Sequence, residues 1–122
     1  IHALFLNPSL QHLTLRNRLN SNNELARLSS YYALRDYGLL DAAFLAERYG
    51  EEEHVFIKRV LLKMMAGLEH GIPLYNLCVA EYGRSGVELK KEMLVLMRNN
   101  PNYAKFIEKT GIKTDSLSPS QK

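Results

Sequence analysis

Apolar residues recur along this chain at intervals of three and four, the spacing of an α-helix that buries one side. No stretch shows convincing alternation at intervals of two, which is typical of a half-buried strand. Short polar or glycine-containing breaks separate the apolar stretches, and such short loops favour antiparallel hairpins. The predicted fold is therefore all-α, with about seven short helices packed as a bundle or a short solenoid. The helices are predicted at residues 7–19, 24–37, 39–49, 51–68, 74–82, 87–98 and 102–109.

Residues that commonly begin or end helices lie at the boundaries of these stretches. Asn7 and Pro8 form a typical helix start, and Gly38 and Gly50 are expected to end the second and third helices. Residues 51–53 are all Glu, and we place them in the first turn of the fourth helix, where carboxylates favour the positive end of the helix dipole. The third helix is apolar nearly all round, so we expect it to be buried.

A degenerate internal repeat is visible when the chain is shifted against itself by 33 residues. The agreement includes both ends of one helix, and a period of this size is the signature of stacked helical hairpins. Short antiparallel helices of similar length also produce accidental periodicity, so an irregular bundle stays open as the alternative. The identical residues that coincide are Gly38 with Gly71, Gly50 with Gly83, Tyr49 with Tyr82, Lys58 with Lys91 and Met64 with Met97.

Two stretches resemble families of helical repeats. Residues 71–75, Gly-Ile-Pro-Leu-Tyr, are similar to the Gly-x-Thr-Pro-Leu-His opening of an ankyrin repeat, although the Gly-Ala-Asp finger that follows an ankyrin hairpin is missing. Residues 31–49 resemble a tetratricopeptide or pentatricopeptide hairpin, with Tyr32, Gly38 and Ala43 in matching places. These resemblances imply stacked hairpins whose groove, formed by one set of helices, binds a peptide, another protein or RNA. No binding residue carries over from them.

The composition is that of an ordinary globular protein, with 46% hydrophobic and 24% charged residues in a chain of 122. We expect one helical domain over residues 1–111 and a flexible tail over residues 112–122, which are rich in Ser, Thr, Lys and Pro. The chain starts at Ile1 without a methionine, which indicates a fragment or a processed product. No apolar run reaches the roughly 18 residues needed to span a bilayer. Because Cys78 is the one cysteine, no internal disulfide forms, and the cytoplasm or another reducing compartment is the expected location.

Positive charge gathers in the C-terminal part of the chain. The formal net charge of +3 falls entirely after residue 70, because the residues up to that point hold equal numbers of basic and acidic side chains. Tyr103 and Phe106 are interleaved with the basic residues, an arrangement that could follow a phosphate backbone. Acidic residues interrupt the run, however, and lysines on an amphipathic helix usually mark a solvated face. The basic residues are Lys90, Lys91, Arg98, Lys105, Lys109 and Lys113.

Three features point towards chemistry, and each has a simpler explanation. Glu51 and His54 have the i, i+3 spacing of a di-metal helix, but the other ligands of such a site are missing, and acids at a helix start explain Glu51. Cys78 lies between apolar neighbours, so we expect a buried thiol rather than a nucleophile. The Gly83–Gly86 turn before a helix is a formal anion site, but a hairpin turn explains it, because no Gly-Lys-Ser/Thr follows. We therefore assign no catalytic residue, cofactor or metal.

The predicted function is non-enzymatic protein–protein interaction, as an adaptor or scaffold domain of a larger protein or assembly. Binding of nucleic acid through the basic C-terminal third is the first alternative, and a small enzyme with a pocket at His54 or Cys78 is the second. Another protein is the expected partner, and a homo-oligomer is left open. Tyrosines and cations are typical anchors of such an interface. The candidate partner-binding residues are Tyr31, Arg59, Lys63, Tyr75, Arg84, Lys90 and Lys91.

Overall fold

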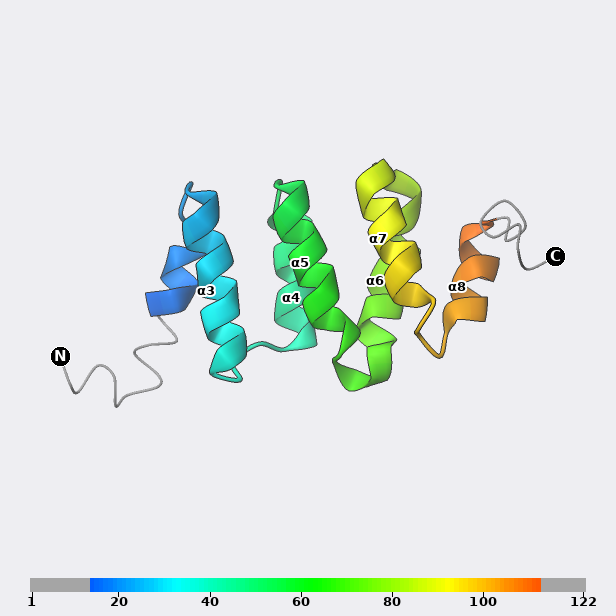
Figure 1. Cartoon of the computed structure of the whole chain (residues 1–122), viewed down its shortest axis with the longest axis horizontal. Coiled ribbons are helices and arrows are strands. Elements are labelled where there is room, and N and C mark those ends of the chain that lie inside the picture. The colour runs from blue at the N-terminus through cyan, green and yellow to red at the C-terminus, as the bar shows by residue number, and fades with distance from the viewer. Residues whose placement is uncertain (1–13, 113–122) are drawn as a thin grey trace. The chain divides into compact units, whose positions relative to one another are not determined.

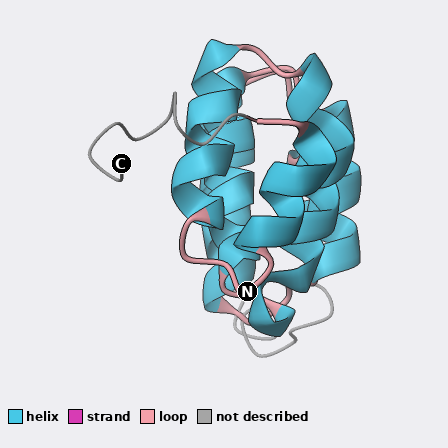
Figure 2. Ribbon diagram, turned by 90° about the vertical axis from the view of Figure 1, so that its right-hand side faces the viewer, coloured by secondary structure: helices cyan, strands magenta, loops and turns pink. Residues whose placement is uncertain are grey.

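The computed structural model describes residues 14–112. Over this range the chain is all-α, as predicted, and contains no strand (Figure 2). Residues 14–18 are also helical. The predicted start at Asn7 and Pro8, and nearly all of the predicted tail at 112–122, lie outside the described residues. The helices are α3 (Glu24–Asp36), α4 (Ala42–Glu51), α5 (Val55–Ala66), α6 (Ile72–Glu81), α7 (Val87–Met97) and α8 (Tyr103–Thr110), with two short 3-10 helices, η1 (Glu69–Gly71) and η2 (Tyr82–Arg84).

The chain divides into two compact units, Ile1–Asp41 and Ala42–Lys122, and each is described by itself. The described part of the first unit consists of the helical residues 14–18, a turn, and α3 (Figure 1). The second unit holds the remaining helices. The single helical domain expected over residues 1–111 stays a prediction.

Helix α3 has strong signals at both ends. The Asn23 side chain accepts hydrogen bonds from the N–H groups of Leu25 and of the residue after it, at 2.9 and 3.1 Å, which caps the start. Gly38 takes the left-handed conformation predicted for it, with φ of +70°. The N–H of Leu39 then donates to the carbonyl of Leu34 at 2.9 Å, which closes the end of the helix. The prediction for this helix is confirmed to within one residue.

Helix α4 starts later and ends later than predicted. It begins at Ala42 instead of residue 39, because the backbone of Leu39 is already engaged in closing α3. It runs through Gly50 to Glu51, so the predicted stop at Gly50 is wrong. The expectation of burial all round is also wrong, since Ala43 is exposed and only one side faces the core. That buried side consists of Ala42, Leu45 and Tyr49.

The loop between α4 and α5 explains why the acidic residues 51–53 do not start a helix. Helix α5 begins at Val55, and its first turn carries no acid. Glu52 instead turns inward, is only 5% exposed, and accepts a hydrogen bond from the N–H of His54 at 3.0 Å. One of the three carboxylates therefore shapes the loop instead of complementing a helix dipole.

The second unit is built from two layers of helices. In one layer α6 packs against both α4 and α8, and in the other α5 packs most extensively against α7. Figure 1 shows α5 in front of α4, and α7 in front of α6. The connecting turns alternate between the two ends of the helices, so successive helices run antiparallel, as predicted for hairpins (Figure 1).

Large apolar side chains fill the space between these layers. The Phe106 ring of α8 meets the Tyr82 ring edge-on, with ring centres 5.6 Å apart. Burial of side chains of this size contributes about 1.5–3 kcal/mol each, so the core holds the hairpins together. Side chains of this unit that are at most 2% exposed are Leu45, Tyr49, Ile57, Leu61, Leu62, Met65, Leu74, Cys78, Met93, Met97 and Phe106.

The α4–α5 hairpin and the α6–α7 hairpin each contain a lysine that lies over a tyrosine ring. Lys58 Nζ lies 4.7 Å from the centre of the Tyr49 ring, and Lys90 Nζ lies 5.3 Å from the centre of the Tyr82 ring. The counterpart of Lys58 in this contact is therefore Lys90 and not Lys91, one residue away from the predicted offset. The repeat itself stays a prediction. The buried positions of α5 and α7 show the same shift, with Ile57 matching Leu89, Leu61 matching Met93 and Met65 matching Met97.

The Asn100 side chain joins the loop before α6 to the loop before α8. It is 8% exposed; its Nδ2 donates to the Gly71 carbonyl at 2.9 Å, and its Oδ1 accepts from the Asn102 N–H at 2.8 Å. Position 71 requires glycine, since its φ is +80° and a Cβ there would collide with Nδ2 of Asn100. Glu69 and His70 precede it with φ of 47° and 58°, so a left-handed turn leads into α6.

Substitution Gly71→Ala is expected to lower the free energy of unfolding by about 2 kcal/mol or more, because it adds backbone strain and a clash with Asn100. Urea denaturation followed by circular dichroism measures this. The matched control is Gly83→Ala, where φ is ordinary and no atom lies within 4 Å of the added Cβ; its effect should stay within about 0.5 kcal/mol. Equal effects of the two substitutions would contradict the role given to Gly71.

Candidate functional site

A groove of about 620 Å³ lies between α6 and α8 in the second unit. These helices are neighbours in one layer, and the groove opens to solvent between them. We call it the α6–α8 groove. It is lined by Ile72, Tyr75 and Asn76 of α6, by Asn102 at the start of α8, and by Lys105, Glu108 and Lys109 of α8.

The buried side of helix α6 fixes the rotation of the helix and therefore the direction of its groove residues. Pro73 lies in its first turn, a position that proline favours because an N–H there would have no acceptor within the helix. Leu74 and Cys78, one turn apart, are the buried residues of this helix. Tyr75 lies beside this buried stripe and Asn76 lies on the opposite side of the helix, and both line the groove. Tyr75 is half-buried, and Asn76 is exposed.

Helix α8 is anchored by one aromatic ring and presents its polar residues to the groove. Phe106 is its one buried residue. Asn102 stands immediately before the first turn, and Gly111, with φ of +72°, ends the helix. Lys105 and Lys109 lie one helical turn apart, and both are exposed along the groove.

The groove combines three kinds of surface. Ile72, which is 51% exposed, and Tyr75 offer apolar contact. The two asparagines add amide groups, each of which both donates and accepts hydrogen bonds. The α8 side carries two lysines and Glu108, a net charge of one positive unit. Among the residues that the structure describes, no salt bridge engages any of these three charges.

Of the residues predicted to bind a partner, Tyr75 is the one that lies in this groove. Tyr31 is 0% exposed, so it is a core residue and offers no surface to a partner. That expectation was wrong because a tyrosine ring packs in a core as readily as at an interface, and α3 turns its Tyr31 side inward together with Leu34.

Two of the predicted arginines are engaged within the second unit. Arg59 Nε donates to Glu92 Oε1 at 2.9 Å, and this ion pair joins α5 to α7. Glu92 is only 8% exposed, so the pair is largely shielded on the acidic side. Arg84 donates to Glu81 at 2.6 Å in the exposed turn before α7. Both arginines therefore have structural partners already.

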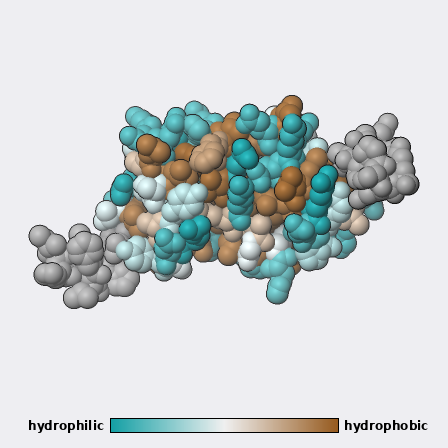
Figure 3. All heavy atoms as spheres, viewed as in Figure 1, coloured by the Kyte–Doolittle hydropathy of each residue, from teal (hydrophilic) through white to brown (hydrophobic). Residues whose placement is uncertain are grey.

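The three predicted lysines differ in surroundings. Lys90 lies over the Tyr82 ring, whereas Lys63 and Lys91 are exposed on α5 and α7. These two helices form the layer that does not contain the α6–α8 groove. On the face of the molecule that includes α5 and α7, hydrophilic side chains lie among exposed hydrophobic ones (Figure 3). The structure thus does not bring the predicted residues of the second unit together.

Sequence reasoning missed most of the groove. Asn76 carried a usable signal, because it is the one strongly polar side chain in an otherwise apolar stretch of α6. Lys105 and Lys109 were singled out from the sequence, but as basic residues for the nucleic-acid alternative and not as part of a groove with α6. Ile72 and Asn102 had none, since only the packing of α6 against α8 brings them to the same groove.

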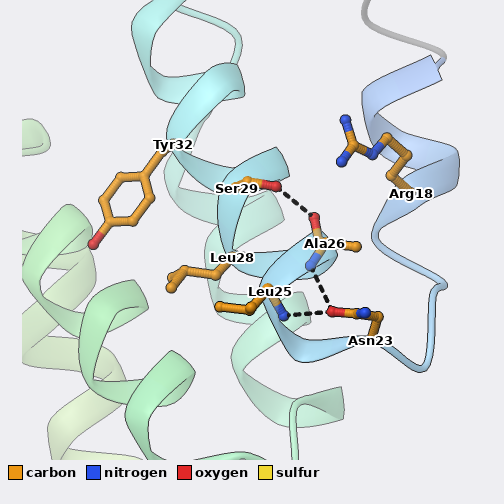
Figure 4. Close-up of a pocket in the computed structure, with 7 residues that line it drawn as sticks. All are labelled: Arg18, Asn23, Leu25, Ala26, Leu28, Ser29 and Tyr32. Carbon is orange, nitrogen blue, oxygen red and sulfur yellow. Dashed lines mark hydrogen bonds between the residues drawn. The ribbon is translucent and has the colours of Figure 1, made fainter.

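A second surface feature belongs to the first unit. A shallow hollow of about 440 Å³ lies along α3, where Leu25, Leu28 and Tyr32 project from the same side of the helix (Figure 4). Leu25 is 75% exposed, and the Arg35 guanidinium lies 4.9 Å from the centre of the Tyr32 ring. Arg18, on the preceding helical segment, also lines the hollow. This surface is mainly apolar and lacks the paired amides of the α6–α8 groove.

The structure shows the surroundings of Cys78, Glu51 and His54, the side chains considered as candidates for chemistry. Burial raises the pKa of the Cys78 thiol to about 12, so it stays protonated and unreactive near neutral pH. Glu51 ends α4, whereas His54 precedes α5, so their i, i+3 spacing does not place them on one helix. Within residues 14–112, no group of three His, Cys, Asp or Glu side chains is arranged to hold a metal ion.

Comparisons with known proteins identify no relative of this chain, so the groove is interpreted from its geometry. No match to the chain was found among models of protein families, curated proteins or solved structures. Among the described helices, none is both long enough and apolar enough to cross a bilayer.

Labelling of Cys78 by a thiol reagent near pH 8 should be about a thousandfold slower in the folded chain than in denaturant. The reason is that the raised pKa leaves very little thiolate, and burial blocks access to the sulfur. The absorbance of the coloured group that the reagent releases on reaction measures the labelling rate of the folded chain and of the denatured chain. A folded-state rate close to that of the denatured chain would contradict the buried, protonated thiol.

Proposed function

We propose that this chain is a non-enzymatic protein-interaction module that holds an extended segment of a partner protein in the α6–α8 groove. The observation that carries the proposal is the pair of asparagine side chains, Asn76 and Asn102, which line one groove from two different helices. A role as adaptor or scaffold within a larger protein or assembly follows from this kind of binding.

Asparagine amides suit an extended main chain. A peptide without secondary structure exposes one N–H donor and one C=O acceptor per residue, and these groups need partners once they leave water. Each asparagine supplies the complementary donor and acceptor. Such main-chain hydrogen bonds provide affinity, while an apolar contact provides specificity for particular side chains.

The apolar part of the groove supplies that contact. Ile72 and Tyr75 lie beside Asn76, and the volume of about 620 Å³ is within the usual range of ligand sites in proteins. Tyrosine is a frequent anchor of protein interfaces because it gives a large contact area with few rotatable bonds. Tyr75 therefore keeps the partner-binding role predicted for it.

The groups at the groove favour binding over catalysis. Lysine, asparagine, glutamate and tyrosine side chains line it, and the one thiol of the chain, Cys78, is buried in the core with its pKa raised. This thiol also fits a reducing compartment such as the cytoplasm, which we retain as the proposed location.

Binding of nucleic acid receives less support. Lys91 lies on α7, which packs against α5, whereas Lys105 and Lys109 lie on α8, which packs against α6. The basic residues of the C-terminal third therefore fall in two layers. A phosphate backbone is best followed by one continuous basic groove. For this reason a protein segment is the partner that we favour.

The double substitution Asn76→Ala with Asn102→Ala is expected to weaken peptide binding by about tenfold or more, because each lost hydrogen bond costs roughly 0.5–1.5 kcal/mol. Short peptides selected from a random phage-displayed library on the immobilised chain serve as probes, and fluorescence anisotropy measures the dissociation constant. Asn99→Ala is the matched control, since Asn99 is exposed and outside the groove. Failure to select any binding peptide, or equal loss in the control, would refute the proposal.

A further inference from the structure

The two lysines of the α6–α8 groove, like Glu108 between them, have no salt-bridge partner among residues 14–112. Lys105 and Lys109 are exposed, line the groove, and take part in no salt bridge within the described residues. The opposite side of the groove, contributed by α6, is uncharged. Positive charge is therefore displayed along one side of a groove whose other side is neutral.

The other basic residues of the second unit either contact another side chain or lie outside the groove. Arg59 pairs with Glu92, and Arg84 pairs with Glu81. Lys58 and Lys90 lie over tyrosine rings. Lys63, Lys91 and Arg98 are exposed but do not line this groove.

We infer that the α6–α8 groove selects an acidic extended segment, in which carboxylates at alternate positions reach Lys105 and Lys109. This inference rests on the proposed function and names the chemistry of its partner. The segment lies along α8 with its main chain held by Asn76 and Asn102. One apolar side chain of the segment rests against Ile72 and Tyr75.

The spacing of the two lysines sets the spacing of the acids. Residues four apart on a helix are separated by about 6 Å along its axis. In an extended chain, side chains on the same face are two residues apart, which corresponds to about 6.6 Å. Acid, any residue, acid is therefore the pattern that matches Lys105 and Lys109, whereas two adjacent acids would point to opposite faces.

Glu108 makes the inference testable in two directions. It lines the same groove as the lysines and repels a bound carboxylate. Removal of its charge should therefore strengthen binding of an acidic segment, whereas removal of the lysine charges should weaken it. A general loss of structure cannot produce both effects.

The test uses the full chain and synthetic fluorescein-labelled peptides of equal length, each with a central leucine. One peptide carries Glu at alternate positions, a second carries Gln at the same positions, and a third carries the same number of Glu residues as adjacent pairs. Anisotropy titrations at low and high salt should show the alternate-Glu peptide binding about tenfold or more tightly than the Gln peptide, with the difference shrinking at high salt. The adjacent-Glu peptide should bind less tightly than the alternate-Glu peptide.

Variants locate the effect. Lys105→Gln with Lys109→Gln should abolish the preference for Glu over Gln, because the affinity for the alternate-Glu peptide falls far more than the affinity for the Gln peptide. Glu108→Gln should tighten the alternate-Glu complex several-fold by removing one like charge. Lys91→Gln, an exposed lysine outside the groove, is the control and should change neither affinity.

The outcomes separate this inference from the proposed function. Equal binding of the Glu and Gln peptides, with both still weakened by the double asparagine substitution, would overturn the acidic preference and leave the peptide-binding function standing. No binding of any peptide would overturn both. A preference for Glu that survives loss of both lysines, or displacement of the peptide by a single-stranded oligonucleotide at equal concentration, would overturn the assignment of this groove to an acidic protein segment.

Discussion

The hydrogen bonds of the Asn100 side chain set the distance between the two helices that form the groove. Its Nδ2 is bound to Gly71, directly before α6, and its Oδ1 is bound to Asn102, directly before α8. A buried amide that loses such a partner costs about 1–3 kcal/mol, so separation of the two helix starts is penalised from both sides. Because Asn102 also lines the groove, the same side chain positions one of the groups proposed to bind a peptide.

The second layer of helices supports this arrangement. Helix α6 packs against α5, and α5 is joined to α7 by its packing and by the pair between Arg59 and Glu92. Breaking a pair with one shielded partner is costly because an uncompensated charge remains, so the pair fixes how the two hairpins stack. A site on packed helices needs little ordering when a ligand binds, and more of the interaction free energy therefore appears as affinity.

Local backbone chemistry made the helices predictable. Asn23, Gly38 and Gly111 act on the turn next to them, so helix ends of this kind can be recognised in a sequence, and the structure confirms the end predicted at Gly38. The α4–α5 boundary was missed because Glu52 turns into the protein, and inward rotation of one carboxylate among three has no local signal. Tyr31 was misplaced for a similar reason, since the side of α3 that faces inward depends on packing. The groove could not be predicted from the sequence, because Tyr75 and Lys105 line the same groove only when α6 packs against α8.

The central claim is that the α6–α8 groove is the binding surface, and nuclear magnetic resonance tests it most directly. The measurement is a ¹H–¹⁵N correlation spectrum of the full chain during titration with the alternate-Glu peptide. Our account predicts that the largest shifts occur at the side-chain amides of Asn76 and Asn102 and at the backbone of α6 and α8. Shifts concentrated on α5 and α7, or along the Leu25 side of α3, would contradict it.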